Sequence, residues 1–337
     1  MKKAVCLSSL LVMSLGALPS AAHHSPAQFD LTRDVIVEGT VKEFSWRNPH
    51  VYFDVEIIGP GGAPVTQRIE AGGASNMAAL GFDGDSVTVG ERVVVQVKPN
   101  RRGAGYIALG WLLTKADGTA IPLHVRAIPQ TEPGAAEASS LAGTWVPQAT
   151  GFAALAVAAR EWPLTPAGRD ASEATGEARD ESRSACIPFG PPALMLLPSA
   201  VIVEQSDSEV TFRLDVMGAE RVVHLDRTEH PADLEPSLQG HSLGRWDGET
   251  LVVDTIGFEA HPDGYSFDLP SSASKHIVER FTLTDDRKHL EYEATVEDPE
   301  YLTAPVTHRA LWDYRPEQSP SNVPCDVEVS GRFTREE

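Results

Sequence analysis

The sequence predicts a mainly β protein built from two barrels. Short alternating segments rich in Val, Ile and Thr recur from residue 35 onward, separated by turns that contain Gly and Pro. Helical patterns are few, and a Pro/Ala/Glu/Ser-rich stretch at residues 129–140 separates two groups of strands. We therefore expect a small OB-like barrel over residues 23–128, a linker over 129–140, and an antiparallel, lipocalin-like barrel with a helical lead-in over 141–337.

The first 22 residues have the pattern of a secretory signal peptide. Lys2 and Lys3 precede an apolar run, and Ser20-Ala21-Ala22 supplies the small side chains expected before a cleavage site. This pattern predicts a mature chain that begins at His23 and is periplasmic or secreted. Since no segment reaches the roughly 20 apolar residues of a spanning helix, we expect no membrane span.

The charge of the chain narrows the classes of partner. The net charge is −20 at pH 7, which disfavours nucleic acid and anionic membranes. A small-molecule ligand remains open as a partner, and the oligomeric state is unknown from the sequence.

Two cysteines, Cys186 and Cys325, follow the predicted signal peptide. Two cysteines in an oxidising compartment usually pair, so we expect a structural disulfide between them. Closing so long a loop stabilises a fold by roughly 4–5 kcal/mol in the chain-entropy model. The chain has no CxxC, so neither a redox motif nor a thiolate zinc site is indicated.

The individual elements follow from local patterns. The expected strands of the first barrel are "VIVEGTVKEFSW", "HVYFDVEII", "VTQRIEA", "ERVVVQVKP" and "YIALGWLLT", with a short helix near Ser75 to Leu80. In the second half, "FAALAVAAREW" predicts a helix, and at least seven strands follow from residue 200. "WDGET" and "TDDRKH" predict hairpin turns.

Both halves also resemble known families. The first half, with "AHHSPAQFD", "VEGTVKEFSWRNPHVYFDV" and "KPNRRGAGY", resembles an uncharacterised family of secreted bacterial proteins. The second, with "CIPFGPPALM", "GHSLGRWDGETLVVDTIGF" and "HIVERF", resembles another such family, although Phe189 interrupts its usual Pro-rich run. The Gly143-x-Trp145 pair is similar to the start of a lipocalin. These resemblances imply folds but no activity.

The predicted N-terminus is a candidate copper site. The α-amine and imidazole of His23 would form a chelate, and His24 or His50 would supply a third nitrogen, a ligand set that suits Cu(II). Cleavage one residue earlier would place a histidine third in the chain, which also binds Cu(II). The alternatives are an exposed, frayed terminus for His23 and His24, and a packing role for His50.

The second barrel carries a candidate acid–base site. Strand alternation in "KHIVERFTL" places Glu279 between large apolar residues on one face, so an inward Glu279 requires a partner. Arg245 or Arg309 could supply the positive charge and contact a ligand. His276 and His241 are the candidate partners of Glu279 in proton transfer. The alternative is a purely structural ion pair.

Three functions remain open. The first is a periplasmic binding or accessory protein that binds copper at its N-terminus and holds a small apolar molecule in the second barrel. The second is an enzyme that catalyses a proton transfer, such as an isomerisation, cyclisation or hydration, in that barrel, or an oxidation at copper. The third is a structural module that uses its barrels as interaction surfaces.

Overall fold

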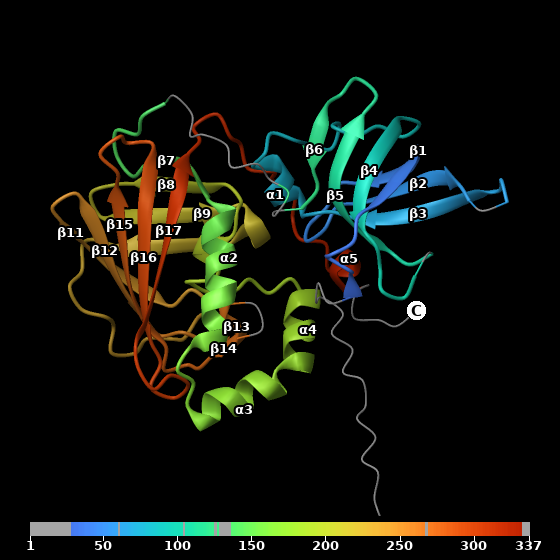
Figure 1. Ribbon diagram of the computed structural model, residues 1–337. Helices are drawn as coiled ribbons and strands as arrows, with labels where there is room; N and C mark the ends of the chain where they lie inside the picture. The colour runs from blue at the N-terminus through green and yellow to red at the C-terminus, as the bar shows by residue number, and fades with distance from the viewer. Residues whose placement is uncertain are drawn as a thin grey trace, which may run out of the picture.

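The computed structural model describes residues 28–59, 61–103, 105–124, 127, 136–266 and 269–331. These residues form two β-barrels with few helices, as the sequence predicts (Figure 1). The predicted signal peptide, His23, His24 and most of the predicted linker lie outside the described residues.

Within the described residues, five strands close the first barrel. They are β1 (Val35–Ser45), β2 (Tyr52–Ile58), β3 (Pro64–Glu70), β4 (Arg92–Lys98) and β5 (Ala108–Lys115). The order β3-β2-β1-β4-β5 closes through a parallel pairing of β3 with β5, and β6 (Ala120–Pro122) extends the sheet. The short helix α1 (Ala74–Ala78) falls between β3 and β4. Alternate side chains, among them Val41, Phe53, Val55 and Leu113, are buried in the interior, which agrees with the OB-like barrel expected.

The second barrel closes from nine strands of the described chain. They are β7 (Gly143–Pro147), β8 (Val201–Gln205), β9 (Glu209–Leu214), β10 (Glu220–His224), β11 (His241–Asp247), β12 (Thr250–Ile256), β15 (His276–Leu283), β16 (His289–Glu297) and β17 (Val306–Tyr314). The predicted hairpin turns join β11 to β12 and β15 to β16. One pairing, β10 with β11, is parallel, which departs from the fully antiparallel barrel expected. The parallel pairing is possible because residues 225–240 provide a long crossover connection.

Aromatic side chains fill the interior of the second barrel. Trp145, Phe212, Phe281, Tyr292 and Trp312 are each at most 1% exposed. The Phe281 ring lies 5.0 Å from Phe212 and 5.2 Å from Tyr292, centroid to centroid. A small apolar ligand inside this barrel would therefore have to displace a packed aromatic side chain.

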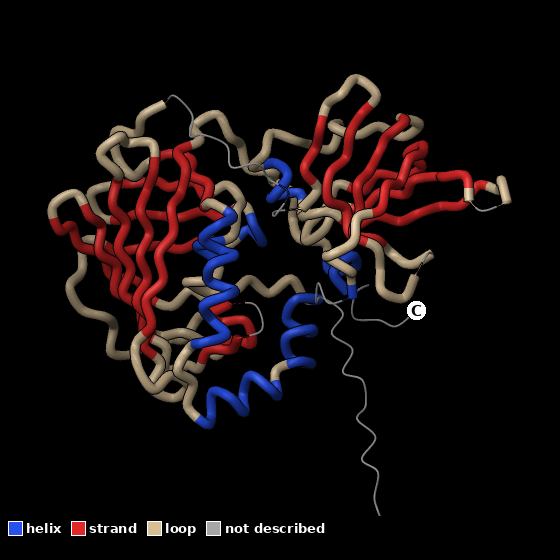
Figure 2. Tube along the Cα trace, in the orientation of Figure 1, coloured by secondary structure: helices blue, strands red, loops and turns tan. Residues whose placement is uncertain are grey.

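The helices lie outside the strands (Figure 2). The predicted helix is α2 (Ala149–Ala158), which packs on β17 where Gly151 approaches Ala310 closely. The remaining elements are the helices α3 (Pro166–Ala174), α4 (Gly176–Ser184) and α5 (Val327–Gly331), the short helical turns η3 (Ala159–Glu161), η4 (Leu194–Leu196) and η5 (Val216–Gly218), and the hairpin of β13 (His261–Ser266) with β14 (Leu269–Ser271). None of the described helices is long and apolar enough to cross a membrane.

The C-terminal segment ties the two barrels together. The buried side-chain amide of Asn48, in the first barrel, donates to the backbone oxygen of Val323 at 2.8 Å. Arg47 forms an ion pair with Asp326 at 2.6 Å. Between these contacts, Cys325 forms the predicted disulfide with Cys186, which follows α4. The "WRNPH" motif of the first barrel therefore includes residues that dock the end of the chain.

Candidate functional site

A buried ion pair crosses the interior of the second barrel. The guanidinium of Arg221, on β10, contacts both carboxylate oxygens of Glu279, on β15, and its Nη1 donates to Oε1 at 2.9 Å. Arg221 also donates to the hydroxyls of Ser242 and Thr255, and the Tyr292 hydroxyl donates to Glu279 at 2.8 Å. Burial, followed by the nearby Glu279 charge, raises the pKa of Tyr292 well above its ordinary value. This network satisfies both charges within the barrel.

The prediction that Arg245 or Arg309 would partner Glu279 is wrong. Both arginines are exposed on the outer face of the barrel, and Arg309 pairs with Glu293 on the neighbouring strand. Arg221 was missed because alternation shows which face a residue occupies, but not which strand lies opposite it across a closed barrel. The available signal was an arginine at an inward position of "ERVVHLD".

Four histidines and one carboxylate form a cluster on the outer face of the second barrel. We call His224, His230, His241, Asp254 and His276 the outer-face histidine cluster. They lie on β10, the crossover connection, β11, β12 and β15. Figure 1 shows β11 and β12 on the side of this barrel that lies away from the first barrel.

Contacts link these groups in series. His230 Nδ1 lies 2.8 Å from His241 Nδ1, and His230 Nε2 donates to Asp254 Oδ1 at 3.0 Å. The other carboxylate oxygen of Asp254 accepts from His276 Nε2 at 2.9 Å. The His224 and His241 rings stack at 5.1 Å between centroids.

The surroundings shift the pKa values of this cluster in opposite directions. Desolvation, followed by the neighbouring His230 and His224, lowers the pKa of His241. The hydrogen bond to Asp254 raises the pKa of His276, and the same contact lowers the pKa of Asp254. His241 is thus biased toward its neutral form, while His276 and Asp254 are biased toward an ion pair.

A cleft of about 580 Å³, open to solvent, adjoins this cluster. It forms where β10 and β11 diverge, since only two residue pairs join these strands. Its walls combine apolar and polar side chains: Pro188, Ala219, Val222, His224, Leu238, Gln239 and His241, with Glu220 and Glu259 at exposed positions and Arg221 buried.

Three side chains of this cleft carry buried polar atoms that lack a hydrogen-bond partner among the described residues. These atoms are His241 Nε2, Gln239 Oε1 and His224 Nδ1, the last of which lies 3.5 Å from Glu209 Oε1. The other ends of the first two side chains are held: His241 Nδ1 faces His230, and Gln239 Nε2 donates to the Phe189 backbone oxygen at 2.9 Å. Buried polar atoms without a partner are rare, so their presence in residues that line one cleft marks it as a candidate binding site.

The predicted proton-transfer partners of Glu279 do not meet it. His276 and His241 lie on the outer face, whereas Glu279 is fully buried inside the barrel and engaged by Arg221 and Tyr292. His241 and His276 are instead linked to each other through His230 and Asp254. His230 itself was missed because it lies in a connection without periodicity.

The predicted copper ligands are only partly within the described residues. His23 and His24 lie outside them, and copper binding there stays a prediction. His50 is half-buried, and its Nδ1 lies 3.2 Å from both the Ala71 backbone oxygen and Glu70 Oε1. Burial raises the pKa of Glu70, with His50 opposing that shift. Within the described ranges, no group of three or more His, Cys, Asp or Glu side chains is arranged to hold a metal ion.

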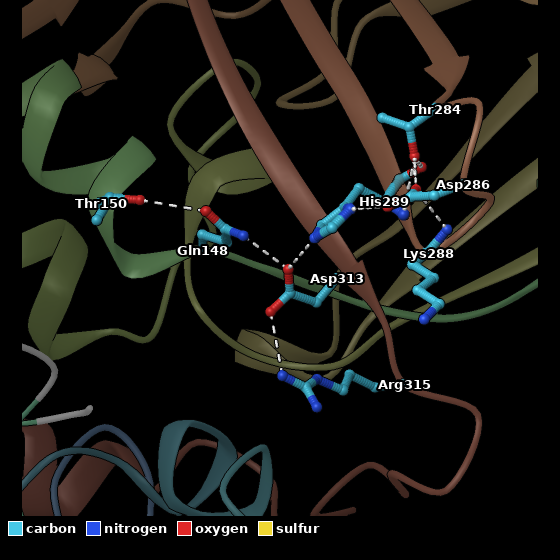
Figure 3. Close-up of polar contacts among 8 residues, drawn as sticks. All are labelled: Gln148, Thr150, Thr284, Asp286, Lys288, His289, Asp313 and Arg315. Atoms are coloured by element: carbon cyan, nitrogen blue, oxygen red, sulfur yellow. Dashed lines mark hydrogen bonds and ion pairs between the residues drawn. The ribbon is translucent and has the colours of Figure 1, made fainter. Parts of the chain in front are cut away.

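A second polar cluster lies at the other side of the second barrel. Figure 3 shows Asp313 between Gln148, His289 and Arg315. Asp313 accepts from Gln148 at 2.7 Å and from Arg315 at 3.2 Å, and His289 lies 3.7 Å away. These contacts join Gln148, the residue just before α2, to β16 and β17. We therefore interpret the cluster as structural.

Two further ionisable groups are buried near the hairpin of β13 and β14. The Lys275 ammonium donates to the backbone oxygens of Pro191 and Gly264, and lies 4.2 Å above the Phe258 ring. Burial lowers the Lys275 pKa to about 7. Burial likewise lowers the pKa of His261 to about 4. These contacts hold loop backbone in place at the end of the barrel.

The fold and the cleft define a two-barrel, mainly β protein with a histidine-lined surface site. Residues 11–107 match the model of a family of unknown function, DUF6152. This match covers most of the first barrel and agrees with the resemblance of that half to an uncharacterised family. No curated protein and no solved structure matches the chain. The resemblance of the second half stays a prediction.

Proposed function

We propose that this chain is an exported binding protein that holds a small molecule in the cleft between β10 and β11. The observation that carries the proposal is the pair of buried, unpartnered atoms, His241 Nε2 and Gln239 Oε1, in one cleft. Burying either atom without a partner costs about 1–3 kcal/mol, which a ligand could recover. The predicted signal peptide supports export.

The lining indicates the class of ligand. Gln239 Oε1 is only an acceptor, so the ligand has to offer an N–H or O–H donor. Pro188, Ala219 and Leu238 favour an apolar body, and the exposed carboxylate of Glu259 disfavours an anion. The carboxylate of Glu220 is paired with Arg213 at 2.9 Å. We therefore expect a neutral or cationic molecule with an apolar part and at least one donor.

Titration with two simple probes tests this proposal. Phenol has an apolar ring and an O–H donor, whereas benzoate has a similar ring and a negative charge. We expect phenol to shift the side-chain nitrogen NMR signals of His241 and to bind more weakly to Gln239→Leu. His289→Gln, which alters a histidine of the structural cluster in Figure 3, is the matched control and should bind phenol normally.

The outcome that contradicts the proposal is equally specific. If phenol leaves the His241 signals unchanged, or if benzoate binds as well as phenol, the cleft is not the donor-recognising site proposed here. Equal binding by wild-type protein and Gln239→Leu would exclude Gln239 from the site.

A further inference from the structure

The contacts in the outer-face histidine cluster limit which ring nitrogens carry hydrogens. A carboxylate only accepts hydrogen bonds, so the contact of His230 Nε2 with Asp254 requires a hydrogen on Nε2. One further hydrogen lies between the two Nδ1 atoms, which are 2.8 Å apart. When His241 carries that hydrogen on Nδ1, its Nε2 has a lone pair and both rings are neutral; when His241 Nε2 has gained a proton and His230 carries the hydrogen between the Nδ1 atoms, His230 is an imidazolium beside Asp254.

The second arrangement contains one more proton than the first, and its positive charge lies on His230. If His241 Nε2 accepts a proton in the cleft, the Nδ1 hydrogen of His241 can pass to His230 Nδ1 across the 2.8 Å contact. His241 then remains neutral, and the positive charge lies on His230, 3.0 Å from the Asp254 carboxylate. Asp254 thereby stabilises a charge created by a reaction in the cleft.

We propose that His241 is a general base that accepts a proton from a carbon acid bound in the cleft, and that His230 and Asp254 are positioning residues that take up the resulting charge. The substrate class is a neutral molecule with an acidic C–H next to a carbonyl or imine and with an N–H or O–H donor for Gln239 Oε1. Returning the same proton to another atom of the substrate completes an isomerisation without any co-reactant. The inference rests on the proposed function, because it requires a molecule in the cleft.

The environment of His241 suits this role. Burial and the neighbouring His230, His224 and Arg227 favour its neutral form, so a free lone pair is available near neutral pH. Its Nε2 is buried without a hydrogen-bond partner among the described residues, and the His241 side chain lines the same cleft as Leu238. Two nearby carboxylates would instead favour the protonated form of His241. They are Glu209, which lies 3.5 Å from His224, and the exposed Glu259.

Base-promoted opening of 5-nitrobenzisoxazole tests the chemistry without knowledge of the natural substrate. The base removes the proton from the ring carbon, the C–H electrons form a nitrile, and the N–O bond breaks to leave a coloured phenolate. We expect the intact protein to exceed free imidazole at equal concentration by about 10²-fold, and His241→Gln to lose that advantage. His289→Gln serves as the matched histidine control and should retain it.

The positioning role needs a separate readout. Asp254→Asn removes the charge that stabilises His230, so we expect the midpoint of the pH–rate profile to move and the rate to fall about tenfold. Asp254→Glu keeps a carboxylate and should restore the wild-type profile. An unchanged profile in Asp254→Asn, measured on folded protein, would overturn the relay.

Binding and chemistry are separated by an unreactive, neutral molecule of the same shape. Calorimetry with 5-nitroindazole on the same samples measures occupancy of the cleft. Binding without ring opening, or ring opening that survives in His241→Gln, overturns the general base but leaves the binding proposal intact. If neither 5-nitroindazole nor phenol binds, both proposals fail.

Discussion

His230 and His241 face each other through their Nδ1 atoms at 2.8 Å, and this contact joins a surface carboxylate to a solvent-open cleft. His241 belongs to β11, whereas His230 belongs to the crossover that makes β10 and β11 parallel. The crossover between the parallel strands β10 and β11 therefore borders the cleft and also supplies His230.

The ion pair inside the barrel predicts a large stability effect. Glu279→Gln removes one charge and leaves Arg221 charged and buried, so the free energy of unfolding should fall by about 3–5 kcal/mol. Urea unfolding measures this change. The double variant Arg221→Met/Glu279→Leu should lose less than the sum of the single changes. A loss below about 1 kcal/mol for Glu279→Gln would show that the pair contributes little.

The contact of Asp254 with His276 predicts a defined pH window. The pKa of His276 is raised, so its contribution to stability is complete below its unfolded value of 6.5 and is lost as pH rises through the folded pKa. The pKa of Asp254 is lowered, so its contribution is complete above 3.8 and is lost as pH falls through the folded pKa. The stability difference between wild type and Asp254→Asn should therefore be largest between these values.

Thermal or urea unfolding across that range checks the window. Asp247→Asn is the matched control, because the Arg280 partner of Asp247 does not change its charge there. A difference between wild type and Asp254→Asn that stays constant up to pH 9 would contradict the assignment to His276.

Lys275 predicts the opposite dependence on pH. Its pKa falls from 10.5 to about 7 in the folded protein, so the unfolded chain binds more protons between these values. Stability should therefore rise with pH across that range relative to Lys275→Met, which cannot titrate. Parallel unfolding curves for the two proteins from pH 7 to pH 10 would show that Lys275 keeps its ordinary pKa.

The disulfide predicts a stability difference that depends on the redox state. Replacing both Cys186 and Cys325 with serine should lower the free energy of unfolding by about 4–5 kcal/mol in the chain-entropy model. Urea unfolding with and without reductant measures it. Reductant should lower the free energy of unfolding of the wild type and leave that of the serine variant unchanged. An equal loss in the two proteins would show that the change does not come from the Cys186–Cys325 bond.

Alternation and turn residues were sufficient to predict both barrels. The pattern in "KHIVERFTL" placed Glu279 on the same face as large apolar residues, and "WDGET" located a hairpin, because each signal is local in the sequence. The partner of Glu279 was not predictable in this way: β10 and β15 are separated by two strands in the barrel order, and only closure brings Arg221 across to Glu279.

The cleft was not predicted for a related reason. His230 lies in a connection without periodicity, and its position over His241 depends on how residues 225–240 cross the end of the barrel. The signal that could have been used is the spacing of His224, His230 and His241 in one short stretch of sequence. His241 itself was predicted as a proton-transfer residue, but with Glu279 rather than with His230.

The most direct test of the binding site is a crystal structure of the mature protein soaked with phenol. We predict phenol in the cleft, with its hydroxyl within hydrogen-bond distance of His241 Nε2 or Gln239 Oε1 and its ring against Leu238. A cleft that holds only water, with both of these atoms satisfied by water or by the protein, would contradict it.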